Sequence, residues 1–148
     1  MFLTFADGST GNQGLETDTS LSYNPSTNLL STTATQAQYA DLAEKYSSDQ
    51  EYEAGTVVMF GGDAEVTISE DRTKKVAGVV SSLPAYLMNS HMESVTVDIA
   101  LQGRVQCKVE GNISKGDMIV AGNTPGVGIA ENNPKMGQVI GKALESYS

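Results

Sequence analysis

The sequence predicts a mainly β protein: an extended N-terminal segment, one short helix, then a compact antiparallel β sandwich or barrel domain. Three short apolar runs lie between residues 102 and 130, at 104–109, 118–121 and 127–130, and glycine-rich turns separate them. Runs of this length, bounded in this way, are typical of strands in a small sheet. Apolar and polar residues also alternate over 95–101, which is the pattern of a half-buried strand.

Residues 1–34 differ in composition from the rest of the chain. They contain no Lys or Arg and are rich in Ser, Thr, Asn and Gly. We expect a short strand at 2–5 and a hairpin in which strands at 21–23 and 28–31 flank the turn 24–27, where Pro25 follows Asn24. Because a lone hairpin is marginal in water, this segment needs a partner. We expect the partner to be other copies of the same segment, and the alternative is the chain's own β domain.

Residues 35–46 carry the one helical pattern. Tyr39, Leu42, Ala43 and Tyr46 are spaced as i, i+3, i+4 and i+7, which places them on one helix face. Thr35 and Gln38 have the spacing of a capping box. A strand is the alternative, in which residues 39, 41 and 43 would face one way and residues 40, 42 and 44 the other. We therefore predict a helical connector over 35–53.

The β domain is expected to span 54–148. The residues from 83 to 88 form an apolar stretch broken by Pro84, and we expect a loop there. Gly78 in the run 75–81 indicates a bulge or a close approach of two backbones. Further strands are expected at 56–60, 64–69, 75–81, 95–101, 104–109, 118–121, 127–130 and 136–144.

Charge and cysteine content exclude several classes of function. Eighteen acids against nine bases give a net charge of −9, which repels phosphate, so we expect neither nucleic acid nor an anionic membrane as a partner. No apolar run is long enough for a membrane span, and no signal peptide precedes Asp7, so synthesis in a cytoplasm is expected. Cys107 is the single cysteine and shares a strand face with Val105 and Val109, which predicts a buried, inert thiol.

Residue types that could support catalysis are present but not arranged in a known motif. Ser82 or Ser90 with His91 and Asp98 would supply a hydrolase triad, but no GxSxG elbow accompanies them. The acid pairs Asp63/Glu65 and Glu70/Asp71 lack the spacing of an EF-hand loop. The glycine-rich stretch 122–128 lacks the Lys-Ser/Thr pair of a phosphate loop. We expect no catalytic, metal or cofactor site.

Two parts of the chain resemble tailed-phage proteins. TDTSLSYNPSTNLL, residues 17–30, is similar to a unit of fibre proteins of marine and cyanobacterial phages. QYADLAEKY at 38–46 resembles the β-rich C-terminal domain of such fibre and virion structural proteins, and the likeness continues through GTVV at 55–58, VAGVVS at 76–81 and KGDMIV at 115–120. The resemblance implies a homotrimeric virion appendage attached by one end. It also implies that similar domains chaperone trimerisation and that some cleave themselves.

The chain has one YNPST unit and no repeat array, so the expected function is a short, non-enzymatic trimeric appendage on the head, neck or tail. The alternatives are a capsid decoration protein, a receptor-binding tip and a self-cleaving trimerisation domain in which Asp41 and Glu44 assist a serine. The expected partners are copies of itself, other virion proteins and a host surface, and the expected location is the virion. The residues expected at the interface between copies are Tyr39, Leu42, Ala43, Tyr46, Leu21, Tyr23 and Leu29.

Overall fold

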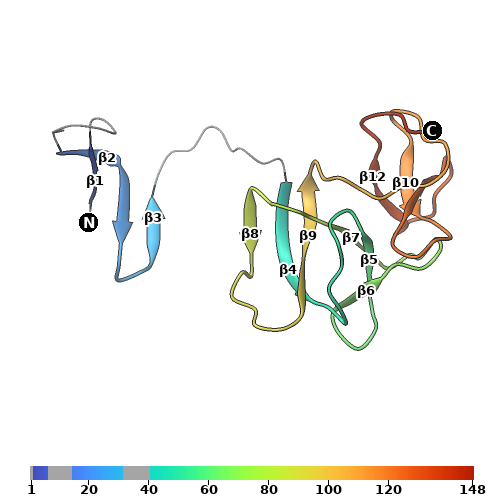
Figure 1. Cartoon of the computed structure of the whole chain (residues 1–148), viewed down its shortest axis with the longest axis horizontal. Coiled ribbons are helices and arrows are strands. Elements are labelled where there is room, and N and C mark those ends of the chain that lie inside the picture. Colours follow the sequence, from blue (N-terminus) through green and yellow to red (C-terminus); the bar gives the residue numbers. More distant parts are fainter. Residues whose placement is uncertain (1, 7–14, 32–40) are drawn as a thin grey trace. The chain divides into compact units, whose positions relative to one another are not determined.

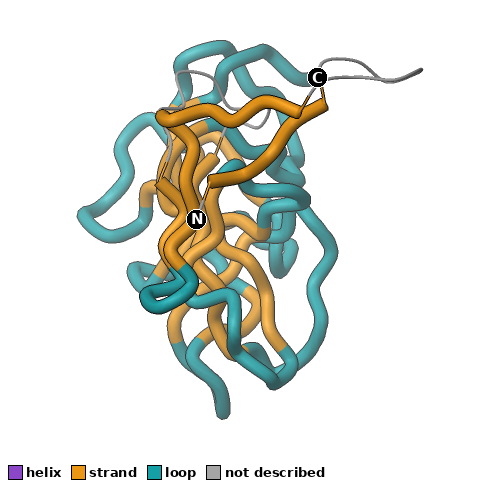
Figure 2. Tube along the Cα trace, turned by 90° about the vertical axis from the view of Figure 1, so that its left-hand side faces the viewer, coloured by secondary structure: helices purple, strands orange, loops and turns teal. Residues whose placement is uncertain are grey.

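The computed structural model describes residues 2–6, 15–31 and 41–148. The chain divides into two compact units, Met1–Ala37 and Gln38–Ser148. Strands and loops make up all of the described residues, with no helix among them (Figures 1 and 2). The expectation of a mainly β protein is therefore confirmed.

The N-terminal unit is a three-stranded antiparallel sheet. Its strands are β1 (Phe2–Ala6), β2 (Leu15–Asn24) and β3 (Leu29–Ser31), in the order β1-β2-β3. The predicted hairpin is the β2–β3 pair, in which Tyr23 lies opposite Leu30. Its β2 strand is much longer than the predicted 21–23, because β1 pairs with it as far as Leu15.

The turn of this hairpin is fixed by side chains of the YNPST motif and of the asparagine that follows it. Asn24 Oδ1 accepts a hydrogen bond from the Ser26 backbone N–H at 3.0 Å, which is an Asx turn. Asn28 has a φ of +52°, in the left-handed region that Asn tolerates well. Its Oδ1 accepts from the Tyr23 hydroxyl at 3.0 Å. The asparagines thus stabilise the turn that the sequence predicts there.

The larger unit is built on a six-stranded sheet. Its strand order is β6-β5-β7-β9-β4-β8, and every neighbouring pair is antiparallel except β4 and β8. Just beyond β4, Ser48 bridges Val66 of β6, so the sheet curls until its two sides meet. The strands are β4 (Asp41–Ser47), β5 (Val57–Phe60), β6 (Val66–Ile68), β7 (Val76–Val80), β8 (Tyr86–Met88) and β9 (Thr96–Gly103).

The predicted helix is wrong over residues 41–46, which belong to strand β4. This strand pairs with β9 over its whole length and with β8 on its other side (Figure 1). Asp41 and Ala43 are buried and Leu42 and Glu44 are partly exposed, so the exposure alternates over the first four residues of the strand. The segment satisfied both periods, and ladder pairing on two sides overrides local helix propensity. Residues 47–53 of the predicted helical connector are not helical either, because they form the end of β4, a bridge at Ser48 and a loop, while residues 35–40 lie outside the described residues.

The stretch 83–88 is also corrected in part, because its second half forms β8. The Ala85 backbone N–H donates to the Asp41 carbonyl at 2.8 Å, and the parallel pairing with β4 continues from Tyr86. Pro84 lacks an N–H and lies just before this pairing starts. The proline therefore marks the start of an edge strand.

A second sheet of three antiparallel strands lies in the C-terminal third of the chain. Its strands are β10 (Met118–Ala121), β11 (Gly128–Ala130) and β12 (Val139–Lys142), in the order β11-β10-β12. The predicted strand 104–109 forms only an isolated bridge, from Val109 to Gly128. The Val57 N–H donates to the Gly126 carbonyl at 2.8 Å, which ties this sheet to β5.

Two apolar clusters hold the larger unit together. The first fills the curled side of the six-stranded sheet, and its members are Val58, Val66, Val80, Val97 and Ile99, with Tyr46 and Tyr52 packed against them. The second, formed by Val57, Val79 and Ala121, is covered partly by Val105, Cys107 and Ile140. Successive side chains of β5 and β7 point in turn into the first and the second cluster. Both faces of these strands are therefore buried, which explains why both are valine-rich.

Candidate functional site

The residue types of a hydrolase triad are present but are not assembled. Asp98 Oδ1 is 2.7 Å from Lys45 Nζ, and both side chains are mostly buried. His91 and Ser90 lie in an exposed turn. Among the described residues, no hydrogen bond joins His91 to Asp98 or to a serine hydroxyl. Asp98 therefore neutralises Lys45 between two strands and does not orient a histidine.

The carboxylates considered for self-cleavage, Asp41 and Glu44, also do not act as a pair. They are three residues apart on β4, so their side chains lie on opposite faces of the sheet. Glu44 accepts a hydrogen bond from the Tyr46 hydroxyl at 2.8 Å. A carboxylate pair for acid and base catalysis requires both groups at one reacting atom, which this geometry prevents.

Asp41 is nevertheless unusual, because its side chain is buried and its Oδ2 has no hydrogen-bond partner. The Ser48 hydroxyl is the other buried polar atom without a partner among the described residues. The two residues stand at opposite ends of β4, about 23 Å apart at the rise of a strand. The Ser48 hydroxyl therefore cannot be the nucleophile that the Asp41 carboxylate would activate.

One member of each acid pair that resembles a calcium site has a structural partner. Glu65 accepts hydrogen bonds from the Ser47 backbone N–H and hydroxyl, at 2.8 and 2.9 Å. The backbone hydrogen bond from Ser47 lowers the pKa of Glu65. Asp71 lies 3.4 Å from Arg72 Nη1. Within the described ranges, no three His, Cys, Asp or Glu side chains gather as metal ligands would.

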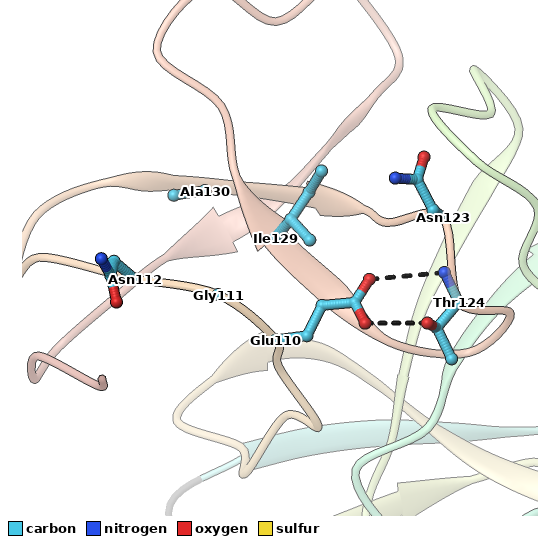
Figure 3. Close-up of a pocket in the computed structure, with 7 residues that line it drawn as sticks. All are labelled: Glu110, Gly111, Asn112, Asn123, Thr124, Ile129 and Ala130. Atoms are coloured by element: carbon cyan, nitrogen blue, oxygen red, sulfur yellow. Dashed lines mark hydrogen bonds between the residues drawn. The ribbon is translucent and has the colours of Figure 1, made fainter.

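The glycine-rich stretch 122–128 borders a pocket of about 640 Å³ (Figure 3). A carboxylate of the chain itself occupies the hydrogen-bond donors there. Glu110 accepts from the Thr124 hydroxyl at 2.7 Å and from its backbone N–H at 3.4 Å. Because Glu110 is anionic and already uses these donors, a phosphate would meet repulsion instead of a cradle. At Gly126, φ is +78° and an added Cβ would lie 2.8 Å from Thr56 Cγ2, so its role is conformational.

Cys107 lies among partly buried apolar side chains next to the second cluster. Burial raises the pKa of its thiol to about 11. The thiol also donates a weak hydrogen bond to the Lys108 carbonyl, with 3.4 Å between sulfur and oxygen. These observations are those of an inert structural cysteine.

We expect Cys107 to react slowly with Ellman's reagent at pH 8. A thiol with a pKa near 11 has about 100-fold less thiolate at that pH than one near 9, and the thiolate is the reactive species. The reaction rate should rise with pH until the pH reaches the pKa of about 11. In 6 M guanidinium chloride, which unfolds the chain, Cys107 should react as fast as a free thiol. Equal rates in buffer and in denaturant would contradict the buried placement.

A larger groove, of about 1370 Å³, lies on another part of the β domain. Its walls are the segment 104–109 and the C-terminal residues 140–147, and the ends of β7 and β9 complete it. Leu101, Leu144 and Tyr147 line this groove and are 44%, 57% and 54% exposed. Sequence reasoning missed the groove, because its walls come from segments about forty residues apart that share no motif.

The predicted interface residues fall into three groups. Tyr39 lies outside the described residues. In β4, Leu42 and Tyr46 share one face of the strand, and Ala43 lies fully buried on the other. A helical stripe of these residues therefore does not form. Tyr46 packs against the first apolar cluster and also lies edge-on to the half-exposed Phe60, at 5.9 Å between ring centroids. Leu21 and Tyr23 belong to β2 and Leu29 to β3, the strands of the predicted hairpin, and their place at an interface between copies stays a prediction.

Comparison of the chain with models of protein families, with curated protein sequences and with solved structures found no match. The described residues contain no helix long and apolar enough to cross a membrane.

Proposed function

We propose that this protein is a structural, non-catalytic component of a tailed-phage virion that assembles as a homotrimer. The resemblance of the YNPST and YADLAEKY segments to fibre and virion proteins supports the phage assignment. Its role would be a short appendage on the head, neck or tail, and a capsid decoration trimer is the nearest alternative. A receptor-binding tip is less favoured, because Tyr86, 64% exposed in β8, is not joined by a second described aromatic in a neighbouring loop.

The observation that carries the trimer proposal is the size of the N-terminal unit. It is a separate sheet within 37 residues. Units below about 40 residues rarely bury enough surface to be stable without a disulfide, a metal or an oligomer. Cys107 lies in the other unit, so a disulfide within this sheet is excluded. Pairing between copies then supplies the missing apolar contacts.

Light scattering behind a sizing column tests this proposal, with an expected mass three times that of the 15.6 kDa chain. We further expect Leu30→Asp to lower this mass towards that of the monomer. Leu30 is 56% exposed opposite Tyr23, so a charge there opposes association without entering a core.

Ser26→Asp is the matched control, because Ser26 is exposed in the turn of the same hairpin. It adds the same charge and should leave the mass unchanged. A monomer for the unmodified chain would refute the trimer. A trimer that survives Leu30→Asp would exclude this face of the hairpin from the interface.

A further inference from the structure

The groove between segments 104–109 and 140–147 is basic, although the chain as a whole is acidic. Arg104, Lys108 and Lys142 line it, and Glu145 is the one acid among the described lining residues. The chain carries eighteen acids and nine bases, so a third of its bases gather at this groove. Such a concentration of one sign attracts an oppositely charged partner.

Two of these cations are not used by the fold. Lys108 Nζ lies 2.8 Å from Glu53 and also donates to the Thr56 hydroxyl at 3.2 Å. For Arg104 and Lys142, the described residues provide no ion pair and no side-chain hydrogen bond. These two side chains are therefore available to acidic groups from outside the chain.

The floor and rim of the groove are apolar. Ile119 and Ile140 come from the small sheet, and Val79 comes from β7. Leu144 and Tyr147, each more than half exposed, stand on the rim. An apolar hollow flanked by unpaired cations suits a ligand that carries apolar and acidic groups together.

The wall 104–109 also has free main-chain groups. Lys108 uses both of its own, because its N–H donates to the Gly55 carbonyl and its carbonyl accepts from the Gly128 N–H, each at 2.8 Å. Neighbouring residues of an extended segment direct these groups to the opposite side. The N–H and carbonyl groups of Cys107 and Val109 have no backbone partner in the described part of the chain. A segment of this kind can pair with an added strand.

We infer that this groove binds an extended peptide segment of a partner protein, in which apolar side chains alternate with acidic ones. The apolar side chains would enter the hollow, the carboxylates would meet Arg104 and Lys142, and the peptide backbone would pair along 107–109. Single-stranded nucleic acid fits less well, because Tyr147 is the one aromatic ring among the described lining residues and bases need several rings to stack on. This inference does not depend on the proposed trimer.

The test uses the full-length chain and two fluorescein-labelled ten-residue peptides, one alternating valine with glutamate and the other alternating valine with lysine. Fluorescence anisotropy at physiological salt, which screens the chain's net charge of −9, should give a Kd about tenfold lower for the glutamate peptide, because its carboxylates meet Arg104 and Lys142 and only Glu145 of the described lining opposes them. Equal affinity for the two peptides, or no binding of either, would overturn the inference.

The double variant Arg104→Glu/Lys142→Glu should reverse the preference between the peptides. Its matched control is Lys74→Glu/Lys135→Glu, which makes the same charge change at exposed lysines outside the groove and should keep the preference. Far-UV circular dichroism checks that both variants remain folded. If the control loses the preference equally, binding follows net charge and the groove is not the site.

Two further measurements test whether the groove has another kind of occupant. Displacement of the glutamate peptide by a ten-residue oligothymidine would indicate a nucleic-acid site and would overturn the inference. A change in the light-scattering mass of the groove variant without peptide would assign the groove to contacts between copies, which would also overturn it. An unchanged mass together with reversed peptide preference supports the inference.

Discussion

Replacing Gly78 with Ala should destabilise the β domain by about 4 kcal/mol, the sum of a steric clash and backbone strain. A Cβ at this position would lie 2.7 Å from Ile99 Cγ2 and 2.9 Å from the Ala100 carbonyl oxygen. Both atoms belong to β9, where Ile99 is fully buried and the oxygen is part of the backbone, so neither can move without disturbing the sheet. The φ of +152° adds a conformation that residues with a Cβ rarely adopt.

Gly61→Ala is the matched control for this variant. Gly61 has a similar φ of +141°, but an added Cβ would have no atom within 4 Å. We expect a loss of about 1 kcal/mol there, from strain alone. Urea denaturation followed by far-UV circular dichroism measures both variants. Equal losses for the two would show that the close approach at Gly78 contributes nothing beyond its backbone angle.

The strands that sequence reasoning located best are those with strong local signals. Met118–Ala121 is bounded by turns, and the structure has β10 over the same residues. The run 95–101 alternates cleanly and became β9, displaced by one or two residues at its ends. The bulge or close approach inferred from Gly78 is also present, because the register shifts beside it and Ile99 packs against it.

The errors arose where pairing partners decide the structure. Residues 41–46 fit a helix as well as a strand, and only the neighbours β8 and β9 decide between the two. Those neighbours are forty or more residues away in the sequence, so no local window contains them. The same reason explains β8, a three-residue strand whose pairing depends entirely on β4. Residues 104–109 show the opposite error. Their alternating pattern predicted a strand, but the segment does not form a full ladder of backbone hydrogen bonds with a neighbour.

The groove could not be predicted from the sequence, for a related reason. Arg104 and Lys142 are ordinary surface cations in the sequence, and their importance comes from lying on one hollow with little acid beside them. Exposure of Leu144 and Tyr147 likewise appears only once the fold is known, because the C-terminal residues could as well have packed inward. Composition alone could only argue against some classes of partner, whereas the placement of these residues in the fold suggests one.

Replacing Ile99 with Ala should lower the free energy of unfolding of the β domain by about 3.5 kcal/mol, the typical cost of such a truncation in a closed core. Ile99 is fully buried and belongs to the cluster formed with Val58, Val66, Val80 and Val97. These side chains come from four strands of the curled sheet, so the cavity cannot close by a shift of one strand. Urea denaturation monitored by far-UV circular dichroism gives the difference.

Leu101→Ala on the same strand is the comparison that isolates burial. Leu101 is 44% exposed at the groove, so its truncation removes a similar number of atoms from a site that water already reaches. We expect a loss of about 1 kcal/mol or less for it. Comparable losses at 99 and 101 would mean that the sheet does not curl around Ile99. A large loss only at 99 would place the core of the domain inside the curl, where β9 directs its alternate side chains.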